Sequence, residues 1–381
     1  MRIGVFSDCY LPAINGVVTS ISQQIEAIEG LGHEVDLYCP QYDPKVTGEP
    51  RVYRLWAKPF PFHKREQMTL PWPPSVLKQI WTKEYDVFHI QTPFSVGLTG
   101  LLAAFARRVP RVFHHHTLWE EYVDYLPIPK ELSARISVLL CRSLANRCQG
   151  VIAPSAQVRD RFMEQGVKSP ISVIPTGIKA DRFRGGRVLE VRADGEEVCL
   201  YMGRLAHEKS LATLVRVFAG IHAKRPSTRL WLVGDGPARS DLEQQVEEAG
   251  LSGVCRFFGF VDRDTLRDYV ATAKVFLFTS LTETQGLVLL EAQAGGLPVV
   301  AFKASGVNEA VESGETGFLV ETGREELMVE AAVDLLTDEA RWKRFSKAGQ
   351  VWSEQFSVER MGEALLEAYK NAIEVARIPN K

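Results

Sequence analysis

The sequence predicts an α/β protein built from two domains, each with a parallel β-sheet. Short apolar runs alternate with helical patterns along nearly the whole chain, and one glycine-rich, charged stretch interrupts this alternation near the middle. Strands that alternate with helices form βαβ units, and such units build parallel sheets covered by helices. Two sheets of similar size on either side of one interruption therefore indicate two Rossmann-like domains.

The first half begins with a short apolar run that ends at Ser7-Asp8, followed by a loop with Pro12 and a helical pattern over Val17–Leu31. Further helical patterns cover Ser95–Arg107 and Ser155–Gly166. The apolar runs between such patterns have the length of buried strands. We expect strands at Arg2–Phe6, Glu34–Tyr38, Val52–Leu55, Asp86–Ile90, Val109–His116, Gly150–Pro154 and Ile171–Pro175.

The predicted organisation is a first domain over 1–182, a linker over 183–197, a second domain over 198–352 and a C-terminal helix over 353–381 that crosses back to the first domain. The linker contains Gly185, Gly186 and Gly195 and has no apolar period. Ligands of open α/β sheets bind beyond the carboxyl ends of the strands, which predicts a cleft between the domains. Strands are expected at Val198–Met202, Arg229–Val233, Cys255–Phe258, Val275–Thr279 and Pro298–Ala301.

Composition excludes several classes of protein. The chain has 381 residues, of which 45% are hydrophobic and 24% charged, as in ordinary globular proteins. No apolar run approaches the ~18 residues of a membrane span, and the start lacks a signal-peptide core, so we expect a cytoplasmic protein. Six cysteines without Cys-x-x-Cys spacing are expected to be reduced. Residues 1–190 carry 23 Lys/Arg and 18 Asp/Glu, which indicates either an anionic partner or an ordinary solvated surface.

The strongest motif lies between Thr279 and Glu291. Glu283 follows a predicted strand, Gln285-Gly286 opens a helix, and Glu291 lies on that helix. The first amides of a helix attract anions, and two carboxylates beside them could accept hydroxyl groups, as a phosphorylated sugar requires. Alternatively, Glu283 only stabilises the start of the helix and Glu291 is a solvated helix residue.

Three further segments follow predicted strands. Arg204 and Lys209 lie on one loop after Val198–Met202 and could bind one phosphate group, or could be surface cations. Asn15-Gly16 opens a helix after the first strand and could bind phosphate or sugar. Gly234-Asp-Gly-Pro237 is either a similar site or a plain turn. There is no Gly-x-Gly-x-x-Gly or Walker sequence, which disfavours dinucleotide and P-loop binding.

The remaining candidates concern metals. His114, His115 and His116 are consecutive, so on a strand the first and third share a face, and one histidine at the strand end could face the cleft. No nearby pattern completes a metal site with them. Asp262-Arg-Asp264 resembles a metal triplet, but it precedes a helical pattern that Asp262 would cap. We expect no metal and no cofactor.

Together these segments resemble the retaining glycosyltransferases of family four, which have the GT-B fold, from Met1 to about Phe356. The resemblance implies that Arg204 and Lys209 neutralise the donor diphosphate, that Glu291 binds the ribose and that Glu283 holds the donor sugar. It also implies that backbone at Phe260 and Val261 meets the base. The same resemblance assigns the diphosphate and sugar to the amides of Gly16, Gly286, Leu287 and Val288, and places His116 near the reacting carbon. The segments that carry it are Glu283–Glu291, Gly203–Lys209, Val233–Pro237 and Ala294–Pro298.

Within this family, His116–Pro127 and Thr282–Glu291 look like bacterial diacylglycerol glucosyltransferases, although Trp119 and Asp124 depart from the usual Tyr and His. The resemblance implies glucose transfer from UDP-glucose to a membrane diacylglycerol, by front-face attack and without metal. Basic and aromatic residues in Lys58–Arg65, with Met68, Leu70 and Trp72, suit either an anionic membrane surface or a loop over the acceptor.

Two other interpretations remain open. The same chemistry could use GDP-mannose or another donor with a polysaccharide, phosphoinositide or soluble acceptor, and a related epimerase would act on UDP-N-acetylglucosamine without any acceptor. A non-catalytic sugar-nucleotide-binding protein is the alternative from another class. The nucleotide, the sugar, the acceptor, the oligomeric state and the histidine that faces the cleft are not fixed by the sequence.

Overall fold

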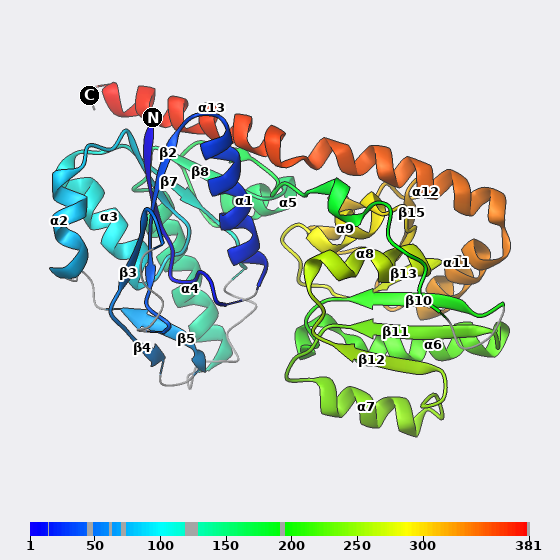
Figure 1. Cartoon of the computed structure of the whole chain (residues 1–381). Coiled ribbons are helices and arrows are strands. Elements are labelled where there is room, and N and C mark those ends of the chain that lie inside the picture. The colour runs from blue at the N-terminus through cyan, green and yellow to red at the C-terminus, as the bar shows by residue number, and fades with distance from the viewer. Residues whose placement is uncertain are drawn as a thin grey trace. The chain divides into compact units, whose positions relative to one another are not determined.

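The computed structural model describes residues 1–13, 15–43, 49–60, 63–69, 74–118, 129–190 and 195–378. The chain divides into two compact units, which are described separately (Figure 1). Unit 1 contains Met1–Gly177 and Val358–Lys381, and unit 2 contains Ile178–Ser357. Each unit is built on a parallel sheet, as the sequence predicted.

Unit 1 is built on a seven-stranded sheet in the order β3-β2-β1-β6-β7-β8-β9, and every neighbouring pair is parallel. The two strands β4 and β5 form a separate antiparallel pair that the sequence did not predict. The bounds are β1 Arg2–Phe6, β2 Glu34–Pro40, β3 Val52–Leu55, β4 Ala57–Phe60, β5 His63–Thr69, β6 Val87–Ile90, β7 Arg111–His114, β8 Gly150–Ala153 and β9 Ile171–Val173.

Helices cover this sheet because their apolar faces pack on its buried strands. One core cluster joins β1 and β2 to α1 and to the C-terminal helix α13, whose Tyr369 is fully buried (Figure 1). A second cluster joins Phe113 of β7 to α3, α4 and α5. The bounds are α1 Gly16–Gly30, α2 Pro74–Thr82, α3 Ser95–Arg107, α4 Lys130–Ala145, α5 Ala156–Glu164 and α13 Val358–Arg377.

Unit 2 has a six-stranded parallel sheet in the order β12-β11-β10-β13-β14-β15. Its core is one large apolar cluster between the sheet and its helices. The strands are β10 Glu197–Met202, β11 Thr228–Val233, β12 Cys255–Gly259, β13 Val275–Phe278, β14 Val299–Phe302 and β15 Gly317–Val320. The helices are α6 Leu211–Lys224, α7 Arg239–Glu248, α8 Arg263–Thr272, α9 Leu287–Ala294, α10 Val307–Ala310, α11 Glu325–Thr337 and α12 Glu339–Ser353.

The boundary between the units lies at 177/178, so the expected linker over 183–197 is not where the chain divides. Phe183 is buried in the core of unit 2. The backbone amides of Arg187 and Leu189 donate to side chains of α8, namely Asp268 Oδ1 at 2.8 Å and Thr272 Oγ1 at 2.8 Å. The segment lacks an apolar period because it is held to α8 by its backbone, which explains why it resembled a linker.

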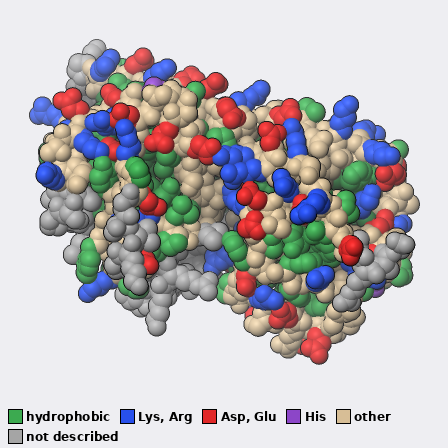
Figure 2. All heavy atoms as spheres, in the orientation of Figure 1, with side chains coloured by type: hydrophobic (Ala, Val, Ile, Leu, Met, Phe, Trp, Pro, Cys, Tyr) green, Lys and Arg blue, Asp and Glu red, His purple; other side chains and the backbone are tan. Residues whose placement is uncertain are grey.

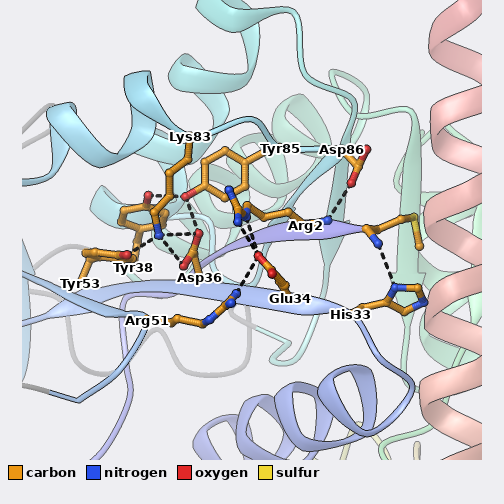
Figure 3. Close-up of polar contacts among 11 residues, drawn as sticks. Arg2, His33, Glu34, Asp36, Tyr38, Arg51, Tyr53, Lys83, Tyr85 and Asp86 are labelled. Carbon is orange, nitrogen blue, oxygen red and sulfur yellow. Dashed lines mark hydrogen bonds and ion pairs between the residues drawn. The ribbon is translucent and has the colours of Figure 1, made fainter.

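A charged network ties together the amino-terminal ends of the strands of unit 1 (Figure 3). The fully buried Asp36 carboxylate accepts from Lys83 Nζ at 2.8 Å and from the Tyr85 hydroxyl at 2.9 Å. Glu34 accepts from Arg2 and Arg51, and these hydrogen bonds lower the pKa of Glu34 to about 2. A buried charge needs such partners to be tolerated. The network therefore holds β1 and β2 at the edge opposite the strand ends where ligands of such sheets bind.

Among the described helices, none is both long and apolar enough to cross a bilayer.

Candidate functional site

The sheet of unit 2 has the strand order of a Rossmann fold, and the order reverses between the neighbouring strands β10 and β13. Ligands of such sheets bind at this switch point, beyond the carboxyl ends of the strands. The loop after β10 carries Arg204 and Lys209, and the loop after β13 carries Glu283. The topology therefore brings together the three charged residues that the sequence analysis selected.

Lys209 and Glu283 form an ion pair across the switch point. Lys209 Nζ lies 2.6 Å from Glu283 Oε1, and the two side chains are only 16% and 17% exposed. Two threonines join the same loops, because Thr279 Oγ1 donates to the carbonyls of Lys209 at 3.2 Å and Ser210 at 3.1 Å, and Thr282 Oγ1 to that of Glu208 at 3.4 Å. Hydrogen bonds between the two loops therefore hold the ion pair in place, and water has limited access to it.

Arg204 lies on the same loop with a more exposed guanidinium, whose Nη1 is 3.9 Å from Glu208 Oε1. The backbone of Arg204 is fixed by the strand that precedes it, because the buried Tyr201 hydroxyl donates to the Arg204 carbonyl at 3.1 Å. Gly203 and Gly234 let the loops after β10 and β11 touch: a Cβ on Gly234 would lie 1.9 Å from the Gly203 carbonyl oxygen. The Gly234–Pro237 turn therefore packs under the Arg204 loop.

The loop after β13 enters α9 through a glycine that must adopt a left-handed conformation. Gly286 is the N-cap of α9, with φ of +73°. Gly306 packs against the same loop, and a Cβ there would lie 2.4 Å from the amide nitrogen of Gln285. The amides of Leu287 and Val288 occupy the first turn of α9, where backbone N–H groups have no partner within the helix. These amides and Glu283 together could bind a polar, partly anionic ligand.

Glu291 is buried, so the alternative that makes it a solvated helix residue is wrong. It lies on α9, which is buried over nearly its whole length, and not on an amphipathic surface helix. Burial raises the pKa of Glu291, and the charge of Arg263, whose Nη2 lies 3.7 Å from Glu291 Oε1, acts in the opposite direction. A buried carboxylate with one charged neighbour is suited to accept hydroxyl groups of a ligand.

Phe260 is the exposed aromatic residue of this region, with 63% of its surface accessible just beyond β12. Val261 follows it and packs partly on the core. Asp262 caps α8, as predicted, by accepting from the amides of Asp264 and Thr265 at 3.0 Å each. Within the described ranges, no three His, Cys, Asp or Glu side chains are grouped so that they could hold a metal ion.

In unit 1, the order of the sheet reverses between β1 and β6, and the candidate residues lie beyond these strands and β7. Gly16 is the first residue of α1, and space around its Cβ position is open. The histidine run alternates as predicted: the His114 and His116 rings stack at 4.0 Å, whereas His115 packs on Phe162 at 4.1 Å. His114 and His115 are fully buried, so His116 is the one of the three that reaches the surface.

Sequence reasoning missed two residues that hold this region of unit 1. Gln91, directly after β6, accepts from His116 Nε2 at 2.5 Å. Asp8, directly after β1, accepts from the hydroxyls of Thr92 and Ser95 at 2.6 and 2.7 Å and from the amide of Val96 at 2.8 Å. Their position immediately after a predicted strand was the available signal. The acceptor segment around Trp119 and Asp124, together with Leu70 and Trp72, lies outside the described residues.

Two family models match the chain, "Glycosyltransferase Family 4" over residues 14–182 and "Glycosyl transferases group 1" over residues 189–352. An alpha-monoglucosyldiacylglycerol synthase of Acholeplasma laidlawii is 31% identical, over 85% of this chain and 86% of the relative. The chain belongs to glycosyltransferase family 4. A second such synthase, from Streptococcus pneumoniae, is 32% identical over 79% of the chain and 71% of its own length.

Other relatives and structures agree with a GT-B glycosyltransferase. A GDP-mannose-dependent alpha-mannosyltransferase of Mycobacterium tuberculosis is 27% identical over 92% of this chain and 93% of its own. The sucrose-phosphate synthase of Thermosynechococcus elongatus has a TM-score of 0.77 at 22% identity, covering 97% of this glycosyltransferase and 98% of that chain. Anabaena HepE in complex with UDP-glucose has a TM-score of 0.75 at 22% identity, over 96% and 98% of the two chains.

The buried histidines of unit 1 predict a loss of stability in acid. Burial lowers the pKa of His115 to about 3, and that of His89 to about 3 as well. Below pH 6.5 these histidines bind protons in the unfolded chain but stay neutral in the folded protein. Their contribution to the free energy of unfolding is therefore complete above pH 6.5 and is lost as pH falls toward 3. We expect His115→Leu to reduce the slope of unfolding free energy against pH by one proton, about 1.4 kcal/mol per pH unit.

Urea unfolding between pH 4 and pH 8 measures this slope. His115 suits the test because neither ring nitrogen has a hydrogen-bond partner among the described residues. His207→Leu is the control, since the His207 side chain is 70% exposed and the slope should not change. Equal slopes for wild type and His115→Leu would mean that His115 is not held neutral by burial.

Proposed function

We propose that this glycosyltransferase moves glucose from UDP-glucose to a hydroxyl group of a membrane diacylglycerol, with retention of configuration and without a metal. The observation that carries the donor assignment is the Lys209–Glu283 pair at the switch point of unit 2, with Arg204 on the same loop. One fixed carboxylate beside two cations is complementary to a sugar linked to a diphosphate. The names of the glucosyldiacylglycerol synthases and the HepE complex support the choice of glucose and UDP.

We assign each group a role in donor binding that its surroundings support. Arg204 offers a planar fork and Lys209 a point charge to the diphosphate, and both stabilise the charge that grows on the leaving UDP. Glu283 accepts sugar hydroxyls, with the amides of Gly286, Leu287 and Val288 beside it. The buried Glu291 accepts the ribose hydroxyls.

Further groups are assigned to the base, the diphosphate and the sugar of the donor. The exposed Phe260 and its neighbour Val261 contact the base. From unit 1, the amide of Gly16 contacts the diphosphate and His116 the sugar near the reacting carbon. Glu283 is a binding group and not a nucleophile, because its charge is already engaged by Lys209. The acceptor hydroxyl attacks from the face of the leaving phosphate and passes its proton to that phosphate.

A lipid acceptor requires a surface that meets the membrane, and α3 and α4 offer one. Both helices connect neighbouring parallel strands in the order β6-α3-β7-α4-β8, and right-handed crossovers place them on the same face of the sheet. Seven large apolar side chains at these helices are 39–51% exposed, namely Phe94, Leu98, Phe105, Leu132, Ile136, Leu139 and Leu140. Exposed apolar residues this numerous on two adjacent helices indicate an interaction surface.

The charge of the same surface suits an anionic bilayer. Residues 94–118 and 129–150 contain seven Lys or Arg and one acidic residue, Glu131. Figure 2 shows that hydrophobic and basic side chains also lie side by side on the face of unit 1 that it draws. Basic residues beside an apolar helix face bind anionic lipid surfaces. We place the enzyme at the cytoplasmic face of the membrane on this basis.

The M. tuberculosis relative supports one second candidate, the same chemistry with GDP-mannose as donor and a phosphoinositide, polysaccharide or soluble acceptor. A donor screen separates the candidates. Purified protein in EDTA receives UDP-glucose, UDP-galactose, UDP-N-acetylglucosamine or GDP-mannose, with and without diacylglycerol vesicles, and release of nucleoside diphosphate is measured. We expect release from UDP-glucose that increases with diacylglycerol.

Arg204→Ala and Lys209→Ala should each lower kcat by about 30- to 1000-fold in this assay, corresponding to ~2–4 kcal/mol of lost transition-state stabilisation. Arg216→Ala is the control, because Arg216 lies on α6 in an exposed ion pair with Glu325 and should not affect turnover. Unchanged turnover in both variants would contradict the phosphate assignment. Release only from GDP-mannose would favour the second candidate, and binding of every donor without release would indicate a non-catalytic protein.

The membrane surface has its own test, by co-sedimentation with phosphatidylcholine vesicles that contain or lack phosphatidylglycerol. The double variant Ile136→Gln/Leu139→Gln should bind the anionic vesicles about 30-fold more weakly, since about 1 kcal/mol of transfer free energy is lost per half-exposed side chain, or about 2 kcal/mol for the pair. Leu31→Gln/Val375→Gln is the matched control, because these residues are each 41% exposed and lie at the end of α1 and on α13, which pack on the other face of the sheet. Equal binding of the two double variants would exclude the α3–α4 surface as the membrane contact.

A further inference from the structure

Behind His116, unit 1 buries a line of polar side chains that substrate binding does not explain. They come from two helices, two strands and the segments after strands, far apart in the sequence, and each is almost inaccessible to solvent. Burying so many polar groups is unfavourable unless each one is hydrogen-bonded in a specific arrangement. The members are Ser20 and Gln24 of α1, His89 of β6, Gln91, His114 of β7, Thr176 and Tyr369 of α13.

The Gln91 side chain is the member that touches His116. Its oxygen, Oε1, lies 2.5 Å from His116 Nε2, and its nitrogen, Nε2, lies 2.8 Å from Gln24 Oε1. An amide nitrogen can only donate and an amide oxygen can only accept. In this orientation Gln91 Oε1 accepts a hydrogen bond from His116, so the imidazole carries its hydrogen on Nε2.

The orientation of Gln91 depends in turn on that of Gln24. The Gln24 amide nitrogen donates to Ser20 Oγ at 2.8 Å, and Ser20 Oγ lies 2.8 Å from Thr176 Oγ1. With its nitrogen used in this way, Gln24 presents its oxygen to Gln91. The two amides therefore point in the same direction along this line, with nitrogen toward α1 and oxygen toward His116.

On its other side Gln91 meets His89, which the C-terminal helix holds. The Tyr369 hydroxyl lies 2.7 Å from His89 Nδ1, and the Gln91 amide nitrogen lies 3.2 Å from the same atom. Both neighbours carry protons, so His89 Nδ1 is the acceptor between them. The three imidazole rings also stack in a row: the centroids of His89 and His114 are 5.4 Å apart, and those of His114 and His116 are 4.0 Å apart.

We propose that Gln91 and Tyr369 are positioning residues that hold the His116 imidazole as a single neutral tautomer, with its hydrogen on Nε2 and its plane fixed. Tyr369 acts through His89 and Gln91, so the C-terminal helix α13, 253 residues away in sequence, takes part in ordering the residue assigned to the donor sugar. The catalytic meaning of this arrangement rests on the proposed function, whereas the tautomer is a property of the protein alone.

A neutral, fixed ring suits glycosyl transfer. The transition state of such reactions has oxocarbenium character, with positive charge developing at the anomeric carbon. An imidazolium beside that carbon would repel this charge, and a ring free to rotate would change its contacts between turnovers. The side of His116 that faces Gln91 and His114 is lined by buried groups, which solvate a protonated ring less well than water does.

Ring ¹⁵N chemical shifts of His116, assigned by loss of the signal in His116→Asn, report the tautomer without any substrate. We expect hydrogen on Nε2 in the wild type at pH 7 and a mixture of tautomers in Tyr369→Phe. Tyr85→Phe is the matched control: its hydroxyl is also buried in unit 1, but its partners are Tyr38 and Asp36. That control should leave His116 unchanged. Hydrogen on Nδ1 of wild-type His116 would overturn the proposal even if the enzyme transfers glucose as proposed.

Kinetics then test whether the arrangement matters for turnover. Tyr369→Phe should lower kcat about three- to tenfold with little change in KM for the donor, and Tyr85→Phe should leave kcat unchanged. Gln91→Leu should lower kcat more than Tyr369→Phe does. Gln91→Glu keeps an acceptor for His116 Nε2, so its kcat should be higher than that of Gln91→Leu. Because its carboxylate favours the imidazolium, Gln91→Glu should also add an acidic limb to the pH profile. Equal kcat in Tyr369→Phe and Tyr85→Phe would overturn the positioning role.

Discussion

The ion pair between Lys209 and Glu283 joins the two loops that leave the neighbouring strands β10 and β13. Much of the local structure of unit 2 follows from the need to hold this pair. Thr279 and Thr282 tie the loops by hydrogen bonds to their carbonyls. Gly306 gives the Glu283 loop room to pass, since a Cβ there would lie 2.7 Å from the Glu283 carbonyl oxygen. The pair is therefore pre-formed, and a donor that meets it pays little for reorganisation.

The two units stabilise their candidate residues by different means. In unit 2 a large apolar cluster supports short loops, and the charged residues lie at the ends of strands. In unit 1 the residue at the strand end, His116, rests on buried glutamines, histidines and Tyr369. A polar interior of this kind fixes orientation and protonation more sharply than apolar packing does, at the risk of instability in acid.

Much of this could be predicted from the sequence, because apolar runs and helical periods are local signals. Arg2–Phe6, Val52–Leu55 and Ser95–Arg107 have the bounds found in the structure. The short β15 and the β4–β5 pair were missed, since Gly317–Val320 is brief and Lys58–Arg65 is rich in proline and charge. The linker was misplaced because Phe183 and Gly186 pack on unit 2 through contacts between distant residues.

For the site, strand ends and family-like motifs were enough to select Arg204, Lys209 and Glu283. Burial was not predictable: the sequence left open that Glu291 is a solvated helix residue, because its neighbours in sequence do not reveal that α9 is buried over most of its length. Gln91 and Tyr369 could not be found, because their relation to His116 depends on β6, β7 and α13 packing together over large sequence separations.

The most direct test of the central claim is calorimetric binding of UDP and UDP-glucose to the wild type, Lys209→Met and Glu283→Gln. The account predicts that Lys209→Met weakens both ligands by a similar factor, since both carry the diphosphate. Glu283→Gln should leave UDP affinity nearly unchanged while removing the affinity that the glucose adds. Equal weakening of UDP and UDP-glucose by Glu283→Gln, or no effect of either substitution, would contradict the assignment of this pair to the donor.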